Sequence, residues 1–124
     1  MPSSYFIDPV RRLVIISADG VLTGAELLAE QRHLASEPLF QRDFSQLFDL
    51  TQVTEARISA DDIRTMASTT AFGPAARRAL IVGEPLLYGL SRMFQLMLDD
   101  RGGTLRIFTD RSEAEAWLGL RPLD

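Results

Sequence analysis

Apolar and polar positions along the chain follow two periods, one typical of strands and one typical of helices. Five short β-rich runs predict strands at 5–8, 12–17, 46–50, 78–83 and 104–109. The first two flank a proline-containing turn and predict a hairpin. The run at 78–83 is almost continuously apolar, which is typical of a strand covered on both faces. We expect Asp19-Gly20 to end the second strand and a loop to follow the third strand through Arg57.

Helix-period segments follow the second strand and each later strand. They begin at capping signals or a helix-initiating proline, at Thr23, Ser59, Pro85 and Ser112. The first three end near Glu37-Pro38, Phe72-Gly73-Pro74 and Asp99-Asp100. The predicted order is therefore β-β-α-β-α-β-α-β-α, an α/β fold with a mostly parallel five-stranded sheet, an N-terminal hairpin and flanking helices. No linker or repeat divides the chain, so we expect one domain over residues 1–124.

The third predicted helix, Leu86 to Leu98, is unusually apolar. At 100° per residue, four side chains cluster on one face that we expect to lie against the sheet, namely Leu86, Leu90, Met93 and Met97. A second group then occupies one flank: Leu87, Phe94 and Leu98. The apolar arc spans roughly 200°, whereas a helix on a sheet needs about 100°. A neighbouring helix, a symmetric partner, an apolar ligand or a membrane surface would cover the remainder.

Composition narrows the function classes. The net charge of −4 argues against sequence-independent nucleic-acid binding, which requires many basic groups. All 13 lysine-or-arginine positions are arginine, which we interpret as a composition bias. There is no cysteine, and no apolar run approaches the roughly 20 residues that span a bilayer. Without an apparent secretion signal, we expect a cytoplasmic protein that needs no metal and no cofactor.

Most motifs that could carry chemistry are better explained structurally. His33 has Glu30 and Glu37 at helical spacing, but a metal site usually needs more fixed ligands. The sequence around Ser91 lacks the second glycine of a nucleophile elbow. The turn at Gly83-Glu84-Pro85 precedes a helix, yet its glutamate would repel a phosphate. These segments therefore predict ordinary helix and turn positions.

Three aspartates, Asp19, Asp49 and Asp110, lie at or near the ends of predicted strands. Ligands of open α/β sheets gather at the carboxyl ends of parallel strands, so these side chains could share a site. The alternative is that each aspartate orders a turn or caps the following helix. An enzyme would rest on these residues alone.

The order of the elements and several segments together resemble the SpoIIAA-like family. The segments are SADGVLT (17–23), LFDL (47–50), ALIV (79–82), YGLSRMF (88–94), FTD (108–110) and EAEAWL (113–118). The resemblance implies the fold shared by STAS and CRAL-TRIO domains. STAS relatives are non-enzymatic regulators that bind proteins and are often switched by serine phosphorylation, and CRAL-TRIO relatives hold lipids in an apolar groove.

The resemblance also implies where a phosphorylation switch would lie. The aspartate-serine signature of the regulators is absent, because Asp49 is followed by Leu50-Thr51. Ser59 is the nearest positional counterpart, and Thr51 is the other candidate phosphoacceptor. Because Ser59 also suits a helix N-cap, structural capping is the simpler interpretation.

Two functional hypotheses follow. The first is a STAS-like interaction or regulatory domain that acts as a homodimer or docks to a regulatory protein through the third helix. The second is a carrier of a lipid or other apolar small molecule in a groove between the second and third helices. The residues proposed for this groove or interface are Met66, Phe72, Leu87, Tyr88, Phe94 and Leu98.

Overall fold

A computed structural model, which describes residues 3–120, contains five strands and four helices in the predicted order. The strands are β1 (Ser3–Asp8), β2 (Leu13–Thr23), β3 (Ser45–Arg57), β4 (Arg77–Ile81) and β5 (Thr104–Phe108). The helices are α1 (Gly24–Ala35), α2 (Ala60–Ser68), α3 (Pro85–Asp99) and α4 (Arg111–Trp117). None of the helices within these residues is long and apolar enough to cross a membrane.

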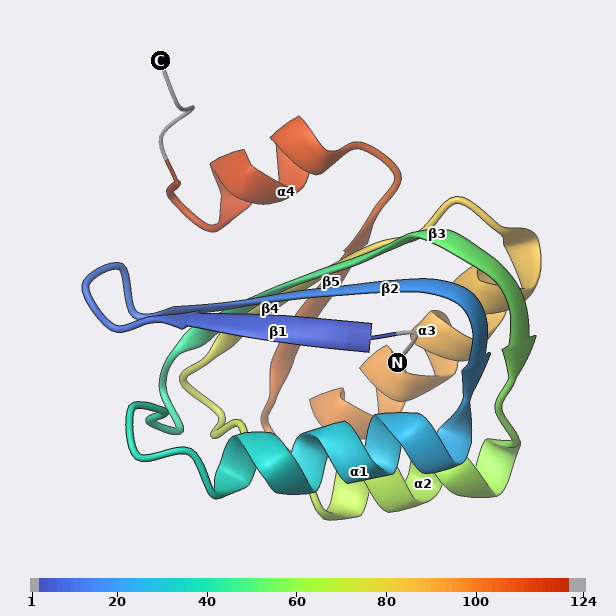
Figure 1. The fold of residues 1–124 in the computed structure, drawn as a ribbon, viewed down its shortest axis with the longest axis horizontal. Helices are drawn as coiled ribbons and strands as arrows, with labels where there is room; N and C mark the ends of the chain where they lie inside the picture. The colour runs from blue at the N-terminus through green and yellow to red at the C-terminus, as the bar shows by residue number, and fades with distance from the viewer. Residues whose placement is uncertain (1–2, 121–124) are drawn as a thin grey trace.

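The strands form one sheet in the spatial order β1-β2-β3-β4-β5. β1 pairs with β2 antiparallel, and the other three pairings are parallel, which confirms the predicted mostly parallel sheet with an N-terminal hairpin. Each parallel connection therefore joins a strand to its immediate neighbour in the sheet, always in the same direction across the sheet. Right-handed crossovers of this kind place their helices on the same face, and α1, α2 and α3 all lie on one side of the sheet (Figure 1).

Side chains of β4 alternate between the two faces of the sheet. Arg78 and Leu80 are directed to the face covered by α1, α2 and α3, as is Val82 directly after the strand, and Leu80 and Val82 join the main core. Ala79 and Ile81 belong to a smaller core on the opposite face. The strand is buried on both faces as predicted, although the sheet order makes β3 the middle strand.

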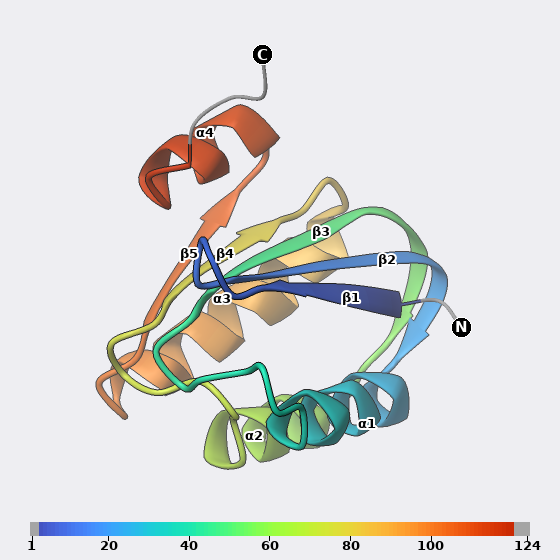
Figure 2. The ribbon, with the colours of Figure 1, turned by 60° about the vertical axis from the view of Figure 1, so that its left-hand side comes forward.

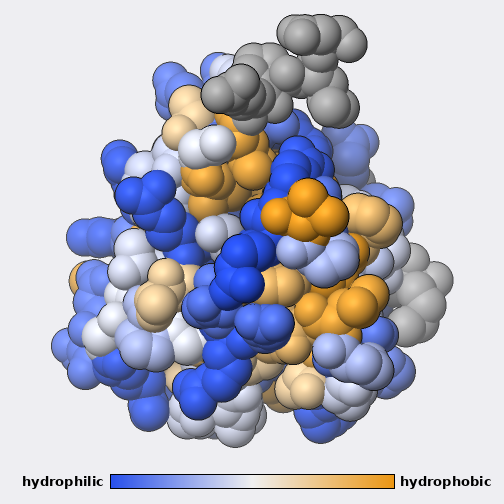
Figure 3. All heavy atoms as spheres, turned by 90° about the vertical axis from the view of Figure 1, so that its left-hand side faces the viewer, coloured by the Kyte–Doolittle hydropathy of each residue, from blue (hydrophilic) through white to orange (hydrophobic). Residues whose placement is uncertain are grey.

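Helix α4 alone covers part of the opposite face. It contacts β3, β4 and β5 and lies on the side of the sheet away from α1 and α2 (Figure 2). The centre of the Trp117 ring lies 5.8 Å from that of the Phe108 ring. Beyond α4, Phe6 of β1 is exposed. Figure 3, viewed from the side of the β1–β2 turn, shows apolar areas separated by a band of hydrophilic side chains. This side of the molecule therefore offers no continuous apolar surface.

The second and third strands are longer than predicted. Asp19 does not end β2, because the strand continues to Thr23 and pairs with the part of β3 that we expected to be a loop. The register shifts twice along this pairing, and Gly20 adopts a positive φ of 65° there. The polar, outward-facing residues of this extension concealed its strand character.

The expected orientation of the third helix is wrong. Leu86 is 54% exposed, whereas the three residues assigned to the spare flank are buried in the main core, Leu87, Phe94 and Leu98. The buried stripe runs through 87, 91, 94 and 98, which is regular helical spacing, but its second member is Ser91. Because Ser91 is polar, the sequence pattern placed the buried face of the helix one residue, or about 100°, away from its position in the structure.

Candidate functional site

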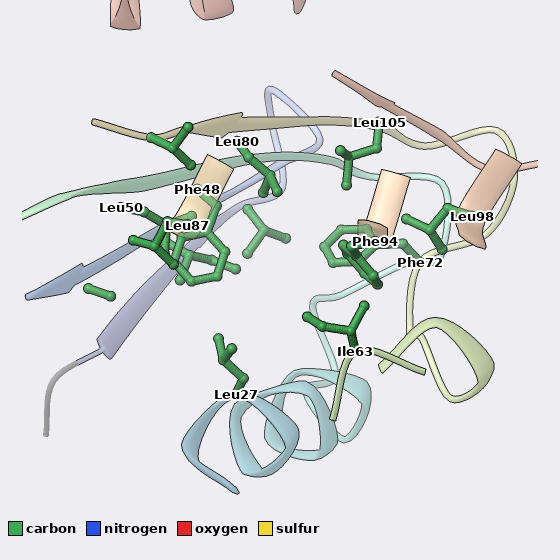
Figure 4. Packing of buried hydrophobic residues seen from close by; sticks show 14 of the residues in the cluster. Leu27, Phe48, Leu50, Ile63, Phe72, Leu80, Leu87, Phe94, Leu98 and Leu105 are labelled. Atoms are coloured by element: carbon green, nitrogen blue, oxygen red, sulfur yellow. The ribbon is translucent and has the colours of Figure 1, made fainter. Parts of the chain in front are cut away.

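A cavity of about 70 Å³ lies between the sheet and helices α1, α2 and α3. Most of its lining is apolar. Figure 4 shows the surrounding core, in which Leu27 and Ile63 point from the α1 and α2 side toward Phe48 and Phe94. The interior beneath the three helices is therefore incompletely filled.

The cavity coincides with much of the predicted groove. Of the six residues proposed for it, four line the cavity, namely Met66, Phe72, Leu87 and Phe94. Tyr88 is 49% exposed and Leu98 is buried in the main core, and neither lines the cavity. Four of the proposed side chains thus line this cavity, and a ligand groove or interface there stays a prediction.

Arg78 contributes a positive charge to this apolar cavity. Its side chain is only 6% exposed and lines the cavity from β4. The Nε–H donates to Gln46 Oε1 at 2.8 Å, and Nη1 donates to Thr70 Oγ1 at 2.9 Å. Gln46 is the direct partner of Arg78 in the β3–β4 register, so the sheet itself places this acceptor.

Two aromatic rings also contact the guanidinium. Its central carbon lies 4.5 Å from the centre of the Phe72 ring and 5.1 Å from that of Phe94. Both contacts are cation–π interactions, which favour a positive charge over the ring face. The rings and the two neutral acceptors hold the guanidinium in place.

No carboxylate pairs with Arg78 among residues 3–120. Burial lowers the pKa of Arg78 to about 9, so the side chain still carries its positive charge at pH 7. The cavity therefore contains a buried cation whose described contacts are all neutral.

Two further polar side chains line the cavity without carrying charge. Ser91 is buried on the inner face of α3, and Gln31 extends from α1. The amide of Gln31 also donates to the backbone oxygen of Thr69 at 2.7 Å, which links α1 to the residues after α2. Polar groups thus come from both the sheet and the helices.

Glu30 of α1 lines the same cavity. Burial raises the pKa of this carboxyl above its ordinary value of 4.5, opposed by a hydrogen bond with Ser3. It forms no ion pair with Arg78 in the part of the chain that the structure describes. The two ionisable lining residues therefore do not neutralise each other.

We expect Glu30→Gln to raise the free energy of unfolding at pH 7. A carboxyl whose pKa is raised by folding favours the folded state below its unfolded pKa, and this contribution is lost as the pH rises through the folded pKa. Glutamine removes the buried charge, so its advantage should be present at pH 7 and disappear as the pH falls below 4.5. Urea denaturation at pH 7 and pH 4 measures the difference.

Glu113→Gln, at an exposed position of α4, is the matched control and should show no such gain in the free energy of unfolding at pH 7. An advantage of Glu30→Gln that is equally large at both pH values would contradict the assigned burial of the carboxylate.

The contacts of the strand-end aspartates are local, and a site shared by all three stays a prediction. Asp19 lies within β2, because the strand continues past it. Asp49 accepts hydrogen bonds from the backbone and hydroxyl of Thr51 and pairs with Arg111 at 3.2 Å, and the Thr51 and Arg111 contacts lower its pKa against the opposing effect of burial. Asp110 is the N-cap of α4 in place of Ser112, whose hydrogen bonds lower the pKa of Asp110. Asp49 and Asp110 thus order local structure.

Both candidate phosphoacceptors are exposed, and the side chain of each forms a hydrogen bond. Ser59 caps α2 in a reciprocal box with Asp62, which confirms the predicted N-cap. Thr51 lies within β3 and donates its hydroxyl to Asp49 at 2.6 Å. Phosphorylation of either residue stays a prediction.

Other polar motifs are also used locally. Glu37 accepts a 2.6 Å hydrogen bond from the hydroxyl of Tyr5, which raises the pKa of Tyr5 to about 12. Glu84 caps α3 by accepting from the backbone of Leu86 and Leu87, so its own carboxylate occupies that helix N-terminus. Within residues 3–120, no three His, Cys, Asp or Glu side chains cluster to hold a metal ion.

Sequence reasoning did not identify Arg78, Gln46 or Glu30 as cavity residues. The available signal was alternation, because Arg78 shares its strand face with Leu80 and Val82. A charge on an apolar strand face indicates a buried ion, yet the run was interpreted as apolar throughout.

Comparison with known proteins agrees with the architecture. No protein-family model and no curated protein sequence matches the chain. Its structure is similar to the crystal structure of an uncharacterized protein of the DUF3478 family, described as having a SpoIIAA-like fold, from Shewanella loihica PV-4. The similarity covers 94% of this chain and 93% of that chain, with a TM-score of 0.61 and 20% sequence identity. The chain therefore has the SpoIIAA-like fold that its sequence resemblance implied.

Proposed function

We propose that this chain binds a small apolar molecule in the cavity beneath α1, α2 and α3 without transforming it. The observation that carries the proposal is the cavity itself, which is lined mainly by apolar side chains inside an otherwise packed core. Native interiors contain few voids larger than a water molecule, and apolar voids bind apolar ligands. The proposal assigns no catalytic residue.

The volume of the cavity limits the size of its occupant. It measures about 70 Å³, compared with the roughly 10–15 Å³ that one water molecule requires and about 150 Å³ for an engineered cavity that binds benzene. Several lining side chains are half-buried, among them Ile58, Met66 and Leu90, so the cavity extends toward the surface and the end of a six-carbon chain would protrude there. We therefore favour a ligand with a short apolar segment over a lipid with two long chains.

Filling the cavity should abolish this binding. We expect 1-hexanol to bind the wild-type chain with a Kd of about 1 mM and Ser91→Leu to remove the binding, because leucine at this inner position of α3 occupies the space. Chemical-shift titration of the backbone amides measures both affinities. Thermal unfolding of the variant verifies that it remains folded.

The matched control is Ser68→Leu, which places the same side chain on the exposed surface of α2. It should bind 1-hexanol as the wild type does. Absence of saturable shifts in the wild-type chain, or unchanged binding by Ser91→Leu, would refute the proposed site.

The hypothesis of a homodimer or a regulatory protein partner stays a prediction. The buried position of Phe94 removes the flank on which the interface was expected. Some apolar area remains on the outer surface of α3, at Leu86, Tyr88 and Leu96.

A further inference from the structure

We infer that the ligand is a small organic monoanion, such as a short-chain monocarboxylate, whose head group pairs with Arg78 while its tail occupies the apolar part of the cavity. This inference rests on the proposed function, because it specifies the ligand class of the same cavity.

The buried charge of Arg78 is uncompensated by any carboxylate among residues 3–120. A buried cation without a counter-ion is unfavourable, and buried charges in proteins are generally paired. Gln46 and Thr70 accept from Nε and Nη1, while a guanidinium carries five N–H donors. A bound anion would supply both the missing charge and further acceptors.

The guanidinium group of Arg78 also has a shape that suits a carboxylate. A guanidinium is a planar fork that matches a carboxylate through two parallel hydrogen bonds. Contacts with Phe72 and Phe94 and the two neutral acceptors restrain this fork before any ligand arrives. Less conformational entropy is then lost when the anion binds.

Charge is distributed unevenly within the cavity. Glu30 lines it from α1 and Arg78 lines it from β4. The two side chains form no ion pair within residues 3–120. A carboxylate is therefore favoured beside Arg78 and disfavoured beside Glu30, which selects one orientation and disfavours a dianion.

The net charge of the chain limits where affinity for an anion can come from. At −4, the molecule as a whole repels anions. Affinity for a carboxylate must therefore come from a local cation, and Arg78 is the buried arginine that lines this cavity.

The test compares two ligands with the same six-carbon tail, hexanoate and 1-hexanol, by titration calorimetry at pH 7. We expect hexanoate to bind the wild-type chain about 10- to 100-fold more tightly than 1-hexanol, as a charge-assisted hydrogen-bonded pair provides. Arg78→Met should lose this difference and keep its affinity for 1-hexanol within about threefold, because the apolar lining is retained.

Arg77→Met is the matched control, since Arg77 precedes Arg78 in β4 but is exposed and donates to the backbone oxygen of Trp117. It should bind hexanoate as the wild type does. Arg78→Lys keeps a positive charge without the planar fork and should show an intermediate affinity, which provides a second reading if the methionine variant does not fold.

The outcomes separate the two proposals. If 1-hexanol binds but hexanoate binds no more tightly, or if Arg78→Met and Arg78→Lys bind hexanoate like the wild type, the head-group assignment is overturned and the cavity remains a binding site. If neither ligand binds the wild-type chain, the proposed function itself fails.

Discussion

Replacement of Phe94 by alanine is expected to lower the free energy of unfolding by about 3–5 kcal/mol. Phe94 is 4% exposed and belongs to the main core between α3 and the sheet. Its ring also lies 5.1 Å from the guanidinium carbon of Arg78. Truncation would enlarge the existing cavity and remove one of the two aromatic contacts of a buried charge.

Leu86→Ala on the same helix provides the comparison. Leu86 is 54% exposed, so its truncation should cost less than about 1 kcal/mol. Urea denaturation at pH 7 measures both values. A loss at Leu86 equal to or larger than that at Phe94 would show that α3 presents the face expected from the sequence rather than the one in the structure.

The double variant Arg78→Met/Gln46→Leu is expected to be more stable than the wild type by about 1–4 kcal/mol in the absence of ligand. Both side chains are buried, and they are hydrogen-bonded to each other across the β3–β4 pair. Their joint replacement removes an uncompensated charge together with its buried acceptor, while the Thr70 hydroxyl keeps the hydrogen bond that it accepts from the Phe72 backbone. Such a gain would mean that the charge is retained for binding at a cost in stability.

Gln46→Leu alone serves as the control for this prediction. It removes a neutral acceptor while the guanidinium remains buried, so it should lower the free energy of unfolding by about 1–3 kcal/mol. Chemical denaturation of the two variants and the wild type measures the three free energies of unfolding. A double variant less stable than the wild type would show that Arg78 stabilises the fold and needs no ligand.

The order of elements could be predicted from the sequence because local signals there agree with the fold. Thr23 and Ser59 cap α1 and α2 as their sequences predict, and Pro85 begins α3. Each parallel strand is followed by a helix, and right-handed crossovers then determine which face of the sheet that helix covers. These features depend on residues close together in the chain.

The long pairing of β2 with β3 could not be predicted in the same way. The extension of β2 through Asp19 and Gly20 depends on hydrogen bonds with residues more than 30 positions away, such as Gln52. Both extensions contain polar outward residues, which resemble loops when read singly. Sheet pairing is a tertiary property that overrides local preference.

The candidate site was predicted only in its apolar part. Phe72 and Phe94, which the sequence analysis proposed for a groove or interface, line the cavity, as large apolar residues gather in interiors. Arg78 and Glu30 were missed, since charged residues are seldom buried and their burial depends on how three helices pack over the sheet. Ser91 was interpreted as an ordinary polar helix position because serine is mostly exposed in proteins.

A crystal structure of the wild-type chain grown with hexanoate tests the account most directly. We expect the carboxylate oxygens to lie about 2.7–2.9 Å from guanidinium nitrogens of Arg78, with the tail between the sheet and α3. Hexanoate bound with its carboxylate directed away from Arg78, or a cavity that stays empty at saturating hexanoate, would contradict the account.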